Sequence, residues 1–130
     1  MIFLAHFCLI LFPIGMYYFG KRYYPEKLWL ITGVSFGLIA SPFSRGLYGF
    51  YFMSFLGFIP GIVGLILSMW HGGPGFKILG LLEMREPGIV VNNMQRLQME
   101  MINAVVWGIL YGIAGSAVDK YLTSQKQSKL

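Results

Sequence analysis

Only a few side chains of this sequence could carry out acid–base chemistry. The 130 residues contain five carboxylates and two histidines. Glu83 and Glu86 flank Arg85 and could act together as a general acid and base, close to the turn at His71, in a lipid-modifying membrane enzyme. The simpler interpretation is a charge cluster solvated at a membrane surface, because no nucleophile elbow, His-Glu-x-x-His or phosphate-binding loop accompanies it. We predict that the protein is not an enzyme, and we assign no catalytic residue.

Side chains that could bind a metal or a cofactor are equally few. His6 and His71 lie far apart in the sequence, and Cys8 is the single cysteine. A structural or catalytic metal usually needs three or four His, Cys or carboxylate ligands at close spacing. We therefore predict no metal and no cofactor. His6, inside an apolar stretch, is expected to be a neutral hydrogen-bonded histidine, with a proton relay or a metal ligand as the alternative.

A glycine-rich segment, His-Gly-Gly-Pro-Gly, precedes Lys77. Successive backbone N–H groups in a turn can form a concave nest for an anion, and a nearby cation would strengthen it. The segment is thus a candidate contact for a lipid headgroup, through His71, Gly72, Gly73 and Lys77. The alternative is a simple turn that ends a helix.

The most developed pattern is a set of small residues at four-residue spacing. This spacing keeps them on one helix face, where missing side chains let another backbone approach closely. The predicted interface residues are Gly33, Gly37, Gly57, Gly61, Ala104, Gly108, Gly112 and Ser116. Such grooves could bind a partner subunit, or they could only pack the helices of one chain against each other.

The composition indicates the elements that position these residues. Hydrophobic residues make up 56% of the chain and charged residues 12%, against about 25% charged residues in soluble proteins. Four stretches contain no charged residue, and each approaches or exceeds the length that an α-helix needs to cross a bilayer. We predict an all-α polytopic transmembrane helical bundle, a single integral membrane domain of residues 1–130. Its four spans are residues 2–19, 27–41, 47–70 and 101–122.

Helix ends are predicted from turn residues. Pro42 is expected to end the second helix by residue 41, and residues 71–75 to end the third. In the following segment, residues 76–100, apolar side chains recur at helical spacing from Val90 onward, which predicts an interfacial amphipathic helix before the last span. Glu100 and Asp119, at the two ends of that span, are expected to be solvated, and Glu100 is spaced to pair with Arg96.

The distribution of basic residues gives a topology. The net charge is +5, but the basic residues lie between the apolar stretches, so nucleic acid is not a predicted partner. Lys21 and Arg22 favour a cytoplasmic first loop and an outside N-terminus. Four spans then place the C-terminus outside, whereas a re-entrant pair within residues 28–70 would place it inside. The plasma membrane or a bacterial inner membrane is favoured, and the final Ser-Lys-Leu is interpreted as a coincidental match to a peroxisomal address.

These observations favour one function and leave two alternatives. The expected function is that of a non-catalytic accessory or structural subunit, which packs against other transmembrane subunits and membrane lipids. The first alternative is a homo-oligomeric channel or small transporter, in which the small-residue face of the last helix lines a pore. The second is the lipid-modifying enzyme.

Overall fold

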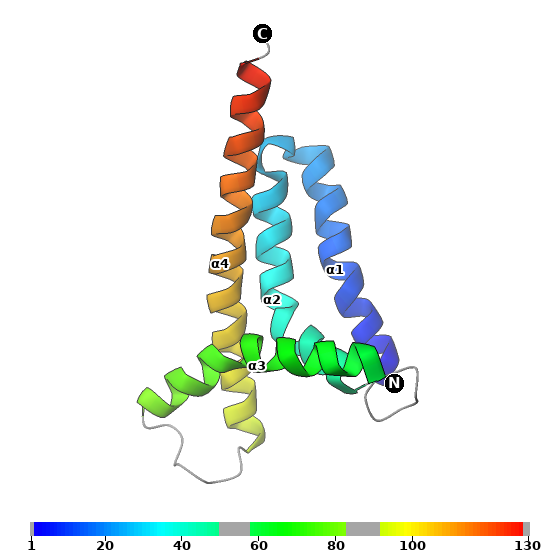
Figure 1. Cartoon of the computed structure of the whole chain (residues 1–130), viewed down its shortest axis with the longest axis vertical. Coiled ribbons are helices and arrows are strands. Elements are labelled where there is room, and N and C mark those ends of the chain that lie inside the picture. Colours follow the sequence, from blue (N-terminus) through cyan, green and yellow to red (C-terminus); the bar gives the residue numbers. More distant parts are fainter. Residues whose placement is uncertain (1, 50–57, 83–91, 129–130) are drawn as a thin grey trace. The chain divides into compact units, whose positions relative to one another are not determined.

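The computed structural model describes residues 2–49, 58–82 and 92–128. Within these ranges the regular structure is entirely helical (Figure 1). The elements are α1 (Ile2–Tyr23), the short 3-10 helix η1 (Pro25–Lys27), α2 (Leu28–Gly49), α3 (Phe58–Leu81) and α4 (Asn93–Gln127). The all-α prediction is therefore confirmed.

Three helical segments of the described chain are long and apolar enough to cross a membrane. They are Pro25–Tyr48, Ile59–Leu81 and Asn93–Gln127. This result agrees with the predicted membrane protein. Because α1 is not among the three, the predicted count of four spans stays a prediction.

The second helix does not end at Pro42. α2 continues through this proline to Gly49, so the predicted end at residue 41 is wrong. Proline costs about 3 kcal/mol inside a helix in water, but in lipid every backbone group released by a helix end would also lack a partner. Two residues after the proline, the Ser44 Oγ donates a 2.6 Å hydrogen bond to the Ala40 carbonyl, within the same helix.

The third helix likewise differs from its predicted bounds. It begins at Phe58 and includes the whole His-Gly-Gly-Pro-Gly segment, ending at Leu81. The predicted turn at residues 71–75 is therefore wrong for the same reason. Pro74 lacks an N–H, and the next amide, that of Gly75, donates to the side chain of Asn103. A neighbouring helix can satisfy backbone groups near a proline in this way.

The last helix begins earlier than expected. Asn93–Gln127 is one continuous helix, so the predicted boundary at residue 101 is wrong. Asn92 and Gln95 cap its start reciprocally, because each side-chain oxygen accepts a hydrogen bond from the other residue's backbone N–H. Of the predicted interfacial segment, residues 76–81 belong to α3 and 93–100 to α4, while 83–91 lie outside the described residues. Its position along a membrane surface stays a prediction.

The chain divides into two compact units. Unit 1 is Met1–Ile39 with Trp107–Leu130, and unit 2 is Ala40–Val106. In unit 1, α1 and the first half of α2 form an antiparallel hairpin around η1, and the second half of α4 runs antiparallel to α2 (Figure 1). Among the described residues, the fully buried hydrophobic side chains are few, and large apolar side chains cover the outside of the helices. Such helices need lipid or other helices around them.

Candidate functional site

Glycine lets α2 and α4 approach at backbone distance in unit 1. A Cβ atom built on Gly33 would lie 2.9 Å from the Tyr111 carbonyl carbon, and one on Gly37 would lie 2.6 Å from the Gly108 Cα. One on Gly115 would lie 2.8 Å from the backbone nitrogen of Leu30. Real Cβ contacts are not this short, so these three positions require glycine. We call this contact the α2–α4 seam.

The other α4 glycines of the seam are less tightly enclosed. A Cβ on Gly112 would meet the Val34 side chain at 2.7 Å, and one on Gly108 would meet the Leu38 side chain at 3.6 Å. Beside them, the rings of Phe36 and Tyr111 pack edge to face at 5.3 Å between centroids. The seam thus combines close backbone contact with aromatic packing.

Four of the predicted interface glycines therefore lie between two helices of one chain. They are Gly33, Gly37, Gly108 and Gly112. Gly61 is buried in α3, Ala104 and Ser116 are partly exposed, and Gly57 lies outside the described residues. Whether any of the eight also contacts a partner subunit stays a prediction. Gly115 was missed, although it continues the helical spacing of Gly108 and Gly112.

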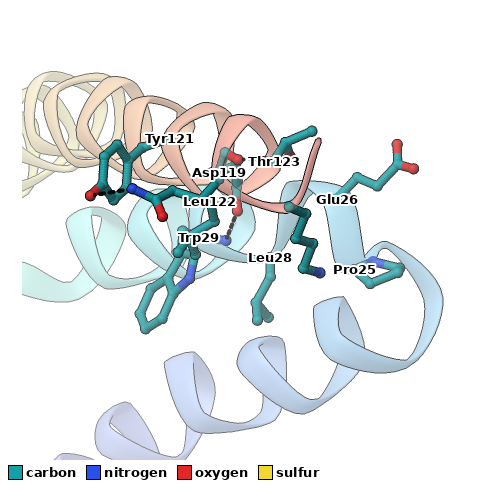
Figure 2. Close-up of a pocket in the computed structure, with 10 residues that line it drawn as sticks. Pro25, Glu26, Leu28, Trp29, Asp119, Tyr121, Leu122 and Thr123 are labelled. Carbon is teal, nitrogen blue, oxygen red and sulfur yellow. Dashed lines mark hydrogen bonds between the residues drawn. The ribbon is translucent and has the colours of Figure 1, made fainter. Parts of the chain in front are cut away.

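Asp119 is not solvated, in contrast to the prediction. It is only 9% exposed, and its carboxylate binds the start of α2 (Figure 2). Oδ1 accepts a 3.0 Å hydrogen bond from the Trp29 N–H, and Oδ2 accepts a 2.8 Å hydrogen bond from the Leu30 N–H. The first N–H groups of a helix have no partner within the helix, and the helix dipole favours an anion there. Asp119 is therefore a cap supplied by another helix.

A pocket of about 690 Å³ lies beside this cap. Pro25 and Glu26 of η1 line one part, and residues of the last turns of α4, including Lys126, line another (Figure 2). Leu28 and Leu122 contribute apolar walls. The pocket thus combines an apolar wall with one cation and one exposed carboxylate.

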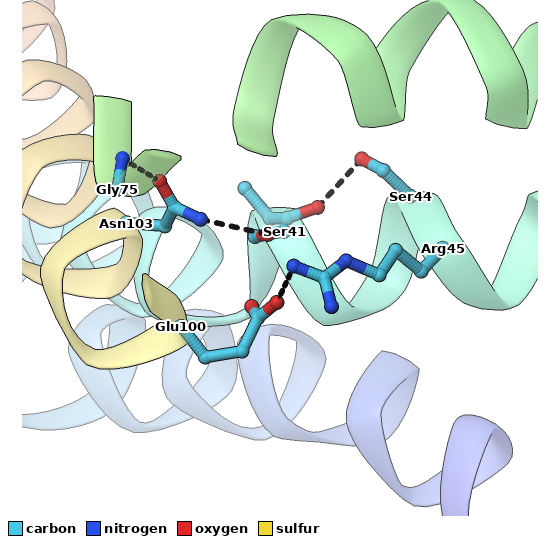
Figure 3. A network of polar contacts seen from close by, with 7 residues as sticks. Ser41, Ser44, Arg45, Gly75, Glu100 and Asn103 are labelled. Atoms are coloured by element: carbon cyan, nitrogen blue, oxygen red, sulfur yellow. Dashed lines mark hydrogen bonds and ion pairs between the residues drawn. The ribbon is translucent and has the colours of Figure 1, made fainter. Parts of the chain in front are cut away.

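Unit 2 holds a buried polar cluster between its helices (Figure 3). Asn103 is fully buried. Its Oδ1 accepts a 2.6 Å hydrogen bond from the Gly75 N–H, and its Nδ2 lies 3.4 Å from the Ser41 Oγ. A Cβ on Gly75 would lie 2.9 Å from that Oδ1, so glycine allows the amide to reach Asn103. The cluster compensates for Pro74.

His71 belongs to the same unit and is 3% exposed. Its Nδ1 lies 2.9 Å from the Ser44 Oγ, and its ring also hydrogen-bonds the backbone of Leu67. The nest predicted for residues 71–75 is not formed, because this segment is helical. Gly72 and Gly73 lie beside open space, and Lys77 is exposed. Lipid contact at this surface stays a prediction.

Arg45 and Glu100 form an ion pair in unit 2 (Figure 3). Neither carboxylate oxygen of Glu100 is accessible to solvent, so the prediction of a solvated Glu100 is wrong. The partner of Glu100 is Arg45 of α2, whereas the predicted partner, Arg96, belongs to α4 like Glu100 itself. A charged group in an apolar helix is costly unless an opposite charge accompanies it.

No protein family, curated protein or solved structure matches this chain.

Within the described residues, the ionisable side chains packed between helices are bound to groups of the same chain. Asp119 binds two backbone amides, His71 binds Ser44, and Arg45 binds Glu100. No three His, Cys, Asp or Glu side chains of the described residues gather as metal ligands do. Glu83 and Glu86 lie outside the described residues. His6 and Cys8 belong to α1, but their side chains are not among those that the structure describes. What the described groups do is hold helices together.

Proposed function

We propose that this protein is a small non-catalytic integral membrane protein that serves as an accessory or structural subunit of a larger membrane complex. One observation carries the proposal: the described interhelical polar groups are paired within the chain, while large apolar side chains point outward. On α3 alone, Ile59, Ile66 and Met69 are 74%, 62% and 73% exposed. The apolar outer surface of the helices therefore suits contact with lipid tails and with other helices.

Open glycines on α3 favour a protein partner for part of this surface. A Cβ built on Gly72, Gly73 or Gly80 would meet nothing within 4 Å. Each glycine lowers the stability of a helix interior by about 1 kcal/mol relative to alanine. In a membrane this cost is offset where another backbone comes close, as it does at Gly33 and Gly37. We infer that a helix of a partner subunit approaches α3 at these glycines.

The packing favours this proposal over the two alternatives. A pore lined by Gly108 and Gly112 would need the face of α4 that α2 occupies within unit 1. For an enzyme, the catalytic use of His71 would require substrate to reach a ring that is 3% exposed and hydrogen-bonded.

Native mass spectrometry of a mild detergent extract tests the proposal. The expected result is a complex of fixed stoichiometry with larger membrane proteins. A wild-type chain that is always found alone, or only with copies of itself, would overturn it.

A pair of variants tests the α3 surface separately. Gly73→Leu adds a side chain where the chain itself leaves open space, so the variant should fold and lose the partner. Gly15→Leu on α1 is the matched control, since Gly15 also has nothing within 4 Å. If Gly73→Leu retains the partner as well as Gly15→Leu does, the partner does not bind at this surface.

A further inference from the structure

One end of unit 1 collects basic residues from two distant parts of the sequence. Lys21, Arg22 and Lys27 flank the end of α1 and η1, while Lys120 and Lys126 lie in the last turns of α4. All five are exposed. The Trp29 and Leu30 N–H groups at the start of α2 donate hydrogen bonds to Asp119 of α4, and residues of both groups share one pocket, so the two groups lie at the same end (Figure 2). We call this surface the basic end.

The charge of the basic end is strongly positive. In the described part of unit 1, its only carboxylates are Glu26 and Asp119, and the Asp119 carboxylate is occupied by two backbone N–H groups. Apart from these two carboxylates and the five basic residues, no described residue of unit 1 is charged. The unit therefore has one charged end, as a membrane-embedded helix group has at one bilayer surface.

Aromatic rings surround the basic end. Tyr18, Tyr23, Tyr24 and Tyr121 are 65%, 58%, 52% and 62% exposed, and Trp29 is 39% exposed. Tyrosine and tryptophan concentrate at headgroup depth, where an amphipathic ring has apolar and polar neighbours at once. The rings therefore locate the basic end at a membrane–water interface.

We infer that the basic end is the cytoplasmic face of the protein and binds the phosphate groups of anionic phospholipids. A cluster of four to eight basic residues next to a membrane helix is typical of anionic-lipid binding in the cytoplasmic leaflet. The adjacent pocket, with Lys126 beside Leu28 and Leu122, can receive a headgroup and the first part of its acyl chain. The excess of positive residues also follows the positive-inside rule.

This inference changes the predicted topology. The first loop and the C-terminal end of α4 lie on the same side, so the chain between them crosses the membrane an even number of times. Three helical segments in this region are long enough to cross. At least one of them therefore does not cross the membrane, and the C-terminal end of α4 is cytoplasmic rather than outside.

Cysteine labelling tests the shared side. In a Cys8→Ser background, Glu26→Cys and Ser124→Cys each place one thiol at an exposed position of the basic end. A membrane-impermeant maleimide should label neither in intact cells and both in inside-out vesicles. Labelling from opposite sides, or labelling of both in intact cells, overturns the inference.

Lipid preference tests the bound ligand. The protein is reconstituted in mixed phosphatidylcholine and phosphatidylglycerol, and the lipids retained after extraction are counted by native mass spectrometry. Each basic residue is worth about fivefold in anionic-lipid binding, so Lys120→Gln/Lys126→Gln should lower the preference for phosphatidylglycerol by up to about 25-fold. The control Arg96→Gln removes an exposed charge of unit 2 and should not. Equal effects of the two variants, or no effect of the first, refute the lipid site. Neither result depends on a partner subunit.

Discussion

Replacing Gly115 by alanine should destabilise the protein, whereas the same change at Gly108 should stabilise it. Both glycines lie on the α2-facing side of α4, so the two variants differ in what the new methyl group meets. At Gly108 the nearest atom is a Leu38 side-chain carbon at 3.6 Å, an ordinary contact. At Gly115 the methyl group meets the backbone of Trp29 and Leu30, with the Leu30 nitrogen at 2.8 Å.

The magnitudes follow from these contacts. Alanine gains about 1 kcal/mol over glycine in a helix interior, so Gly108→Ala should stabilise by up to about that amount. At Gly115 the helices must separate, which costs about 1–3 kcal/mol for overpacking. Separation also weakens the charge-assisted hydrogen bonds to Asp119, worth about 1.5–3 kcal/mol. The expected net loss is about 2–3 kcal/mol. Gly112→Ala should fall between, because it displaces the Val34 side chain, which is stiff in a helix.

Unfolding titrations measure this order. The purified variants are titrated from mild detergent into sodium dodecyl sulfate, and helix content is followed by circular dichroism. Gly15→Ala, on α1 with nothing within 4 Å, is the control for helix propensity and should resemble Gly108→Ala. Equal stability of Gly115→Ala and Gly108→Ala would refute the close approach of α2 and α4 in this register.

Three further predictions use the same titration. Asp119→Ala should lose about 1.5–3 kcal/mol, because two first-turn N–H groups of α2 lose their acceptors, and Asp119→Asn should lose less; an unchanged midpoint in Asp119→Ala would contradict the cap. Asn103→Leu should lose about 1–3 kcal/mol, because the buried Gly75 N–H loses its acceptor, and an unchanged midpoint would contradict this role. Arg45→Gln should lose about 1–2 kcal/mol, since the side chains of Arg45 and Glu100 are both partly exposed. Adding Glu100→Gln should recover part of this loss, because no carboxylate is then left without its cation. If the losses of the two single variants simply add in the double variant, the ion pair is refuted.

Helix content and the apolar character of the helices could be predicted from the sequence, but several helix bounds could not. The uncharged stretches indicated apolar helices, and α2, α3 and α4 are such helices. The rules that predict helix ends at Pro42 and at residues 71–75 hold where water can satisfy a released backbone group. In lipid that partner is missing, so both helices continue, and beside Pro74 the side chain of Asn103 accepts a hydrogen bond from the Gly75 N–H.

The candidate site was predictable where its signal is local. Four-residue spacing located Gly33, Gly37, Gly108 and Gly112 on helix faces, and extending the helical period would have added Gly115. The partners of the charged residues were not predictable, because they lie far away in the sequence. Asp119 binds amides 90 and 89 residues earlier, and Glu100 pairs with a residue of α2. Sequence spacing alone does not predict such contacts, because they depend on how the helices are arranged in space.

Asp119 also accounts for the choice of one register between α2 and α4. Gly33 and Gly37 on α2, and Gly108 and Gly112 on α4, repeat every four residues, so a slip by about one turn would again place glycine opposite backbone. Close packing alone therefore leaves registers of similar energy. The start of α2 has no local cap, because the preceding Pro25–Lys27 turn contains no Ser, Thr, Asp or Asn. Its N–H groups must be satisfied from another helix, and Asp119 reaches them in one register only. The glycines provide the close approach, and the buried carboxylate of Asp119 selects where it occurs.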